Sequence, residues 1–233
     1  MSSISSSHGS HANTFAPAAR IQRSLVANAE KHTLLWLAEH TPGWIHSDHL
    51  TLLGFTSQCL VGFCYALSRL NPDMLLAGII CLALNWLGDS LDGTLARVRN
   101  RQRPRYGFYV DHLADSVAAF FLIGGLAVSG YVHPAISFGM LIAFLMLSIE
   151  TYLATYTLGQ FQLSYYKFGP TEIRILLAIG NIALLKHSRI TLLHRQFLLF
   201  DIGGVIAIAG MSLFLILSAT RHIRKLYNEE RIS

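Results

Sequence analysis

Six long apolar segments dominate the sequence, and each is close to the roughly 20 residues that an α-helix needs to cross a lipid bilayer. They lie at about 49–69, 73–97, 107–130, 133–158, 169–186 and 197–219. Of the 233 residues, 52% are hydrophobic and only 13% are charged, which is too apolar for an ordinary soluble domain. We therefore expect an all-α integral membrane protein with six transmembrane helices.

The segment before the first apolar run has a different pattern. Between residues 18 and 45, apolar residues such as Ile21, Leu25 and Leu34 recur at roughly helical spacing against charged residues. This pattern predicts an amphipathic helix that lies on the membrane surface in front of the spans. Residues 1–17 are rich in serine and histidine and contain no apolar core, so we expect a disordered N-terminal tail.

The remaining chain divides into a membrane catalytic domain at 46–220 and a basic tail at 221–233. Basic residues favour the cytoplasmic side of a membrane. Five arginines follow the second span: Arg97, Arg99, Arg101, Arg103 and Arg105. Together with the basic residues of the tail, these arginines outnumber Lys186, Arg189 and Arg195 between the fifth and sixth spans. We therefore expect the loop after the second span and the tail to lie in the cytoplasm, with those three residues on the other side of the membrane. These loops and their contacts with anionic lipid account for the net charge of +5, so we expect no nucleic-acid binding.

Four aspartates lie where the second and third spans approach the loop between them. Residues three or four apart share one face of a helix, so Asp89 pairs with Asp92 and Asp111 pairs with Asp115. Antiparallel packing of the two helices would bring all four carboxylates to one point. Carboxylates without a matching cation repel one another, and ligation by carboxylates alone favours Mg²⁺ or Mn²⁺ over Zn²⁺. Since such ions commonly also bind substrate phosphates, the pattern predicts a phosphate-bearing ligand.

Small and basic residues accompany the aspartates. Gly93, Ala96 and Gly107 lack bulk where a ligand would press against the helices. Arg97 offers a planar fork that suits a phosphate group. We expect these four residues to contact the ligand.

The whole pattern reads Asp89-x2-Asp92-Gly93-x2-Ala96-Arg97-x9-Gly107-x3-Asp111-x3-Asp115. It resembles the signature of the CDP-alcohol phosphotransferase family at all eight fixed positions. Members of this family are integral membrane enzymes that transfer a substituted phosphate from a CDP-linked donor to an alcohol and release CMP. The resemblance implies a divalent metal at Asp89, Asp92 and Asp111, with Asp115 completing the metal site and acting as general base. It implies the CDP moiety beside Gly93, Ala96, Arg97 and Gly107.

His112 is an alternative general base. It is adjacent to Asp111, and histidine is the side chain that ordinarily titrates near neutral pH. It is one residue out of register with the aspartate face, which favours Asp115 instead.

The second half of the chain contains the candidates for the acceptor site: Glu150, Lys167, Glu172 and Arg174. The segment from Gly169 to Glu172 is similar to a Gly-Pro-x-Glu element of choline and ethanolamine phosphotransferases. Lys167 and Arg174 instead suit an acceptor phosphate, as in the branch that joins CDP-diacylglycerol to inositol phosphate or glycerol phosphate. An equally good interpretation is that these residues are charges at the ends of membrane helices with no role in substrate binding.

Three functions are consistent with the sequence. The leading one is a phospholipid-forming transferase with CDP-diacylglycerol as donor and a small polar alcohol as acceptor. The second uses CDP-ethanolamine or CDP-choline as donor and diacylglycerol as acceptor. The third is a non-enzymatic cation pathway, which would spread acidic residues over several spans rather than two helix faces. In either enzyme one substrate is a lipid, so we expect a site open to the cytoplasm and to the bilayer, and the resemblance suggests a homodimer.

Overall fold

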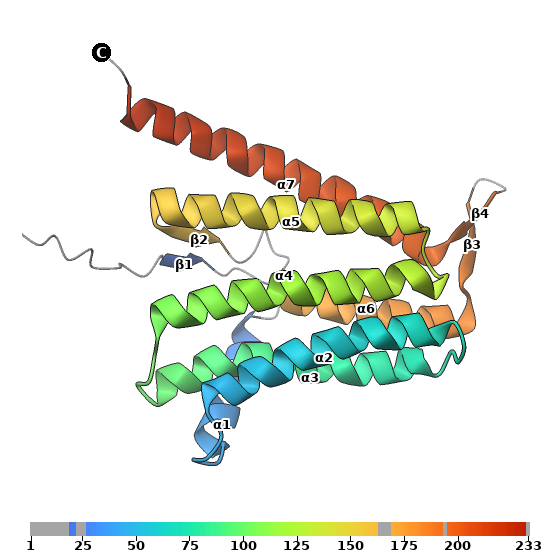
Figure 1. Ribbon diagram of the computed structural model, residues 1–233, viewed down its shortest axis with the longest axis horizontal. Coiled ribbons are helices and arrows are strands. Elements are labelled where there is room, and N and C mark those ends of the chain that lie inside the picture. Colours follow the sequence, from blue (N-terminus) through green and yellow to red (C-terminus); the bar gives the residue numbers. More distant parts are fainter. Residues whose placement is uncertain (1–18, 22–26, 163–168, 193–194, 232–233) are drawn as a thin grey trace, which may run out of the picture.

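The computed structural model describes residues 19–21, 27–162, 169–192 and 195–231, and most of these residues are helical. The helices are α1 (Ala27–His40), α2 (Ser47–Ser68), α3 (Met74–Val98), α4 (Pro104–Ser129), α5 (Pro134–Leu158), α6 (Pro170–Lys186) and α7 (Leu199–Glu229). Helices α2 to α7 lie alongside one another in a single bundle, and α1 packs against α3 at its edge (Figure 1). The predicted tail at 1–17 lies outside the described residues.

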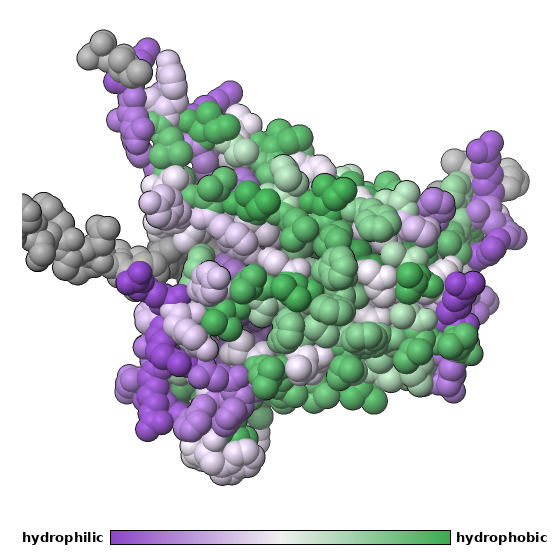
Figure 2. Space-filling view, in the orientation of Figure 1, coloured by the Kyte–Doolittle hydropathy of each residue, from purple (hydrophilic) through white to green (hydrophobic). Residues whose placement is uncertain are grey.

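Within the part of the chain that the structure describes, five helices are long and apolar enough to cross a membrane, namely α2, α3, α4, α5 and α7. Figure 2 shows an apolar band across the middle of the bundle, with hydrophilic residues at its two ends. The predicted segment at 169–186 does form a helix, α6, but its 17 residues extend only about 26 Å at 1.5 Å per residue. That is shorter than the roughly 30 Å of a bilayer core, so five of the six predicted spans are supported.

The predicted surface helix is shorter than residues 18–45. A strand, β1 (Ala19–Ile21), pairs in parallel with β2 (Gln160–Gln162), which follows α5. The backbone of 19–21 is thus hydrogen-bonded to a distant segment instead of forming a helical turn, and the helix begins at Ala27. A second pair, β3 (Arg189–Leu192) and β4 (Arg195–Leu198), forms an antiparallel hairpin between α6 and α7.

Proline and glycine set several helix limits. Proline stands in the first turn of α4, α5 and α6, where its missing N–H costs no helical hydrogen bond. Gly130 and Gly159 follow α4 and α5 with φ of 83° and 63°, a left-handed conformation that favours glycine. Helix α7 continues to Glu229, so the described part of the predicted basic tail extends this helix. The end of α7 and the α3–α4 connection lie at the same end of the bundle (Figure 1).

Glycines allow α2 to approach both helices that carry the aspartates. A Cβ atom on Gly125 of α4 would lie 1.9 Å from the carbonyl oxygen of Gly62. A Cβ atom on Gly88 of α3 would lie 2.4 Å from the backbone nitrogen of Gly54. Small residues permit such close backbone packing between membrane helices. The backbones of α3 and α4 are therefore both held closely against α2.

Gly125→Ala should lower the free energy of unfolding by about 1–3 kcal/mol, because the added methyl group forces α2 and α4 apart. Gly124→Ala is the matched control, since nothing lies within 4 Å of a Cβ atom there. Thermal unfolding of the two purified variants in one detergent measures the difference. Equal melting temperatures would show that the α2–α4 contact is looser than described.

Candidate active site

A small hollow lies between α2, α3 and α4, and all four predicted aspartates line it. Its wall is formed by Thr51, Gly54, Phe55, Gln58, Asn85, Asp89, Asp92, Asp111, Ala114, Asp115 and Ala118. The aspartates come from the second half of α3 and the first half of α4. The expected convergence of the two helix faces is therefore present in the structure.

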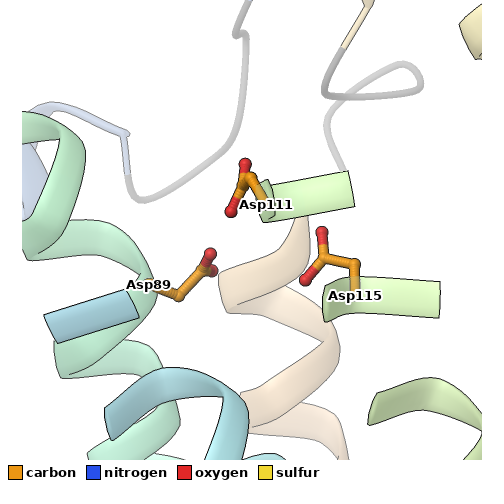
Figure 3. Close-up of side chains that lie close together, drawn as sticks. All are labelled: Asp89, Asp111 and Asp115. Carbon is orange, nitrogen blue, oxygen red and sulfur yellow. The ribbon is translucent and has the colours of Figure 1, made fainter. Parts of the chain in front are cut away.

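Three of the carboxylates are especially close. Asp89, Asp111 and Asp115 each offer an oxygen within 4.8 Å of the others, and their side chains point toward one another (Figure 3). We call these three residues the acidic cluster. Three oxygen ligands of like charge at this separation suit a hard divalent cation such as Mg²⁺ or Mn²⁺.

Asp92 lies in the same hollow but outside the acidic cluster. Its Oδ2 accepts a hydrogen bond of 2.6 Å from the hydroxyl of Thr51 on α2. The sequence predicts all four aspartates as metal ligands, and the three that lie closest together are Asp89, Asp111 and Asp115. Thr51 was not identified from the sequence, where the only signal was a polar residue early in an apolar span.

Arg174 reaches the acidic cluster from α6. Its Nη2 lies 2.5 Å from Oδ2 of Asp89, and its Nε donates a 2.6 Å hydrogen bond to Oδ1 of Asn85. Asn85 in turn donates to the carbonyl of Gly54 and to Gln58 on α2, at 2.9 and 3.1 Å. Asn85 was missed in the sequence, although it precedes Asp89 by four residues and so shares its helix face.

His112 lies on the side of α4 that faces α5. Its ring centroid is 4.0 Å from that of Phe108 and 5.0 Å from that of Tyr152. Its Nδ1 is 3.6 Å from Oδ2 of Asp111, so the ring is next to the acidic cluster but is not part of the wall of the hollow. This placement follows from its position one residue out of register.

The predicted nucleotide contacts lie beside the hollow rather than in its wall. A Cβ atom on Gly107 would meet nothing within 4 Å, and one on Gly93 would meet Nη1 of Arg97 at 3.4 Å. Ala96 is partly buried, and Arg97 is exposed and donates to the hydroxyl of Thr94 at 3.0 Å. A side chain at Gly107 would thus meet open space, whereas the space at Gly93 is bounded by the guanidinium group of Arg97.

The other acceptor candidates have structural partners. Glu150 on α5 accepts hydrogen bonds of 3.0 Å from Ser218, and one of its oxygens lies 2.6 Å from Nδ1 of His222, so it joins α5 to α7. Glu172 accepts a 2.9 Å bond from the backbone N–H of Gly169 and so caps the start of α6. Lys167 lies outside the described residues.

Helix α1 is joined to the helices around the site by Glu30, which the sequence showed only as part of a polar face. Its Oε1 accepts hydrogen bonds from Trp86 (2.9 Å) and Ser90 (3.2 Å) on α3 and from Thr171 (2.8 Å) on α6. Arg99 adds a second link, since it donates to the carbonyl groups of Ile45 and Thr41 at 2.5 and 2.7 Å. The N-terminal helix is therefore fixed to the same end of the bundle as the acidic cluster.

Comparison with known proteins identifies the family of this chain. The family model for CDP-alcohol phosphatidyltransferase matches residues 44–217. Over 104 residues the chain is 32% identical to an archaetidylinositol phosphate synthase of Pyrococcus horikoshii. The aligned residues make up 45% of this chain and 52% of that protein. The chain thus spans about half the length of the curated relative that it matches. Because the family match takes in most of the chain and all four aspartates, this protein belongs to the CDP-alcohol phosphatidyltransferase family.

Proposed function

We propose that this protein is an integral membrane enzyme of phospholipid synthesis that transfers a substituted phosphate from a CDP-linked donor to an alcohol and releases CMP. Family membership supplies the reaction class. The observation that carries the proposal is the acidic cluster, three carboxylates within 4.8 Å in a hollow that also contains Asp92.

The acidic cluster is proposed to hold Mg²⁺ or Mn²⁺, with Asp92 at the edge of the same site. Oxygen ligands of this kind are the ones that hard divalent cations prefer, and phosphate oxygens commonly share their coordination. When bound, such a cation would neutralise negative charge on the donor pyrophosphate and on the leaving CMP. Gly93, Ala96, Arg97 and Gly107 are proposed to contact the CDP moiety, because they lie beside the hollow and a Cβ atom on Gly107 would meet nothing within 4 Å.

Asp115 is proposed as the general base. The acceptor oxygen would form a bond to the phosphorus distal to cytidine as the bond from that phosphorus to the CMP oxygen breaks. Asp115 would accept the proton that the acceptor hydroxyl loses. His112 is the alternative base, but its ring packs between Phe108 and Tyr152, while Asp115 lines the hollow.

We propose CDP-diacylglycerol as donor and a small polar alcohol as acceptor. The name of the Pyrococcus horikoshii relative, a synthase of archaetidylinositol phosphate, supports a phosphorylated inositol as the first acceptor to test. The element from Gly169 to Glu172 gives less support to an amino-alcohol donor, because its glutamate caps α6. The confinement of the acidic cluster to one hollow likewise disfavours a cation pathway, which needs charges along its length.

The active site is proposed to face the cytoplasm. The acidic cluster belongs to the end of the bundle that holds the α3–α4 connection and the end of α7 (Figure 1). Both segments are rich in arginine, the charge pattern of cytoplasmic loops.

CMP release by the purified protein in lipid, with Mg²⁺ or Mn²⁺, tests the proposed reaction. One arm offers CDP-diacylglycerol with inositol phosphate, glycerol phosphate, inositol or serine, and the other offers CDP-ethanolamine or CDP-choline with diacylglycerol. We expect release in the first arm only, and none from Asp115→Asn. Release only in the second arm would show that the donor is a CDP-amino-alcohol and the acceptor diacylglycerol. Release in neither arm would contradict the proposed reaction.

A further inference from the structure

We infer that Arg174 is a positioning residue that fixes the orientation of Asp89 in the acidic cluster and offsets part of the cluster's negative charge. The inference rests on the proposed function, since it concerns the carboxylates that would hold the metal. In this role Arg174 binds the side chains of the site itself and not the phosphate of an acceptor.

The geometry of the contact supports this role. The guanidinium group uses two different nitrogens, Nη2 for Asp89 and Nε for Asn85, at 2.5 and 2.6 Å. These two partners stand four residues apart on one face of α3, so a planar fork can bind both at once. With Oδ2 of Asp89 held by Arg174, the carboxylate is fixed in one orientation, and its other oxygen would remain available to a cation.

Arg174 is itself held in place. Its side chain is only 13% exposed, and Asn85 is tied to α2 through the carbonyl of Gly54 and the side chain of Gln58. One turn earlier on α6, Thr171 donates to Glu30 and so joins the same helix to α1. Side chains that are fixed in this way orient the ligands of a metal site and influence its affinity.

Charge gives the second part of the role. Four carboxylates line the hollow, and Arg174 forms an ion pair with one of them and also interacts electrostatically with Asp115. A positive charge at this position reduces the repulsion among the carboxylates. It also repels a divalent cation, so removing it should tighten cation binding while leaving Asp89 less well oriented.

The test is Mn²⁺ binding to the purified full-length protein in lipid, measured by electron paramagnetic resonance without any nucleotide, together with CMP release at saturating Mn²⁺. The variants are Arg174→Gln, which removes the charge, and Arg174→Lys, which keeps the charge but loses the fork. Arg189→Gln removes an equal charge from an exposed position on β3 and serves as the control.

Arg174→Gln should bind Mn²⁺ about fivefold more tightly or better, because the lost repulsion from a buried positive charge outweighs the looser orientation of Asp89. It should release CMP about tenfold more slowly or worse, because Asp89 no longer holds the cation in the productive position. Arg174→Lys should keep the Mn²⁺ affinity within about twofold and still lose turnover, because one ammonium group cannot replace the planar fork. Arg189→Gln should match the original protein in both measurements. A role in helix packing alone would lower the melting temperature without changing the Mn²⁺ affinity of the folded protein.

Unchanged or weaker Mn²⁺ binding by folded Arg174→Gln overturns the inference, as does original turnover in Arg174→Lys. If Arg174→Gln does not fold, Arg174→Lys decides the question by the same criterion. Asp111→Asn separates this inference from the proposed function. If that variant binds Mn²⁺ as the original protein does, the metal site itself fails. If it binds weakly while the Arg174 variants behave as the original protein, only the inference about Arg174 fails.

Discussion

Asp111→Asn should lower CMP release by about a thousandfold or more, which corresponds to roughly 4 kcal/mol of transition-state stabilisation. The carboxylate of Asp111 lies within 4.8 Å of those of Asp89 and Asp115, so all three are placed to share one cation. An amide has nearly the same shape but no charge and is a poorer ligand for a hard cation. The same variant should therefore also bind Mn²⁺ and the CDP-linked donor more weakly.

Asp73→Asn is the matched control for this prediction. Asp73 is exposed next to the start of α3, at the opposite end of that helix from the acidic cluster. Its substitution removes the same charge and should leave CMP release and Mn²⁺ binding unchanged. Normal turnover by Asp111→Asn would remove the argument for a metal site, and equal losses in both variants would point to a general effect of charge.

The acidic site could be predicted from the sequence because its geometry is local. Within each helix, the spacing of three or four residues fixes which aspartates share a face, and a short link makes antiparallel packing of the two helices the simplest arrangement. Asp89, Asp111 and Asp115 met as this reasoning predicted. The apolar spans follow equally directly from hydropathy, and five helices meet the length that a membrane requires.

Contacts between distant segments were not predictable in this way. Helical periodicity indicates which face of α6 carries Arg174, but not that this face meets Asp89, which lies 85 residues earlier. For the same reason Glu150 looked available for an acceptor, whereas it pairs with His222, which lies 72 residues later. The surface helix was overestimated because β1 pairs with a segment far along the chain.

The element from Gly169 to Glu172, which resembles a motif of choline and ethanolamine phosphotransferases, also has a local structural role. Gly169, Pro170 and Glu172 stand at the first positions of a helix, where glycine, proline and a glutamate that bonds back to the backbone are each favourable. The motif therefore has a structural role as a helix start. A resemblance that rests on such a short element says little about the substrate.

Asp115→Asn should likewise abolish CMP release, by about a thousandfold or more, yet retain most of its affinity for the CDP-linked donor. Asp89, Asp92 and Asp111 would still line the hollow and bind the cation, whereas the group that accepts the proton of the acceptor hydroxyl would be lost. Turnover and equilibrium binding of the donor, measured on the same preparation, separate the two effects. Loss of donor binding equal to that of Asp111→Asn would show that Asp115 acts in the site only as a metal ligand and not also as the base.

His112 supplies the decisive comparison. His112→Phe keeps a ring packed against Phe108 and Tyr152, so it should fold normally and lose no more than about tenfold in turnover if Asp115 is the base. His112→Ala should behave similarly in turnover but melt at a lower temperature, because it leaves a cavity beside those two rings. If His112→Phe instead loses turnover more severely than Asp115→Asn does, the imidazole is the base. The side of α4 that faces α5, and not the hollow alone, would then contain part of the catalytic site.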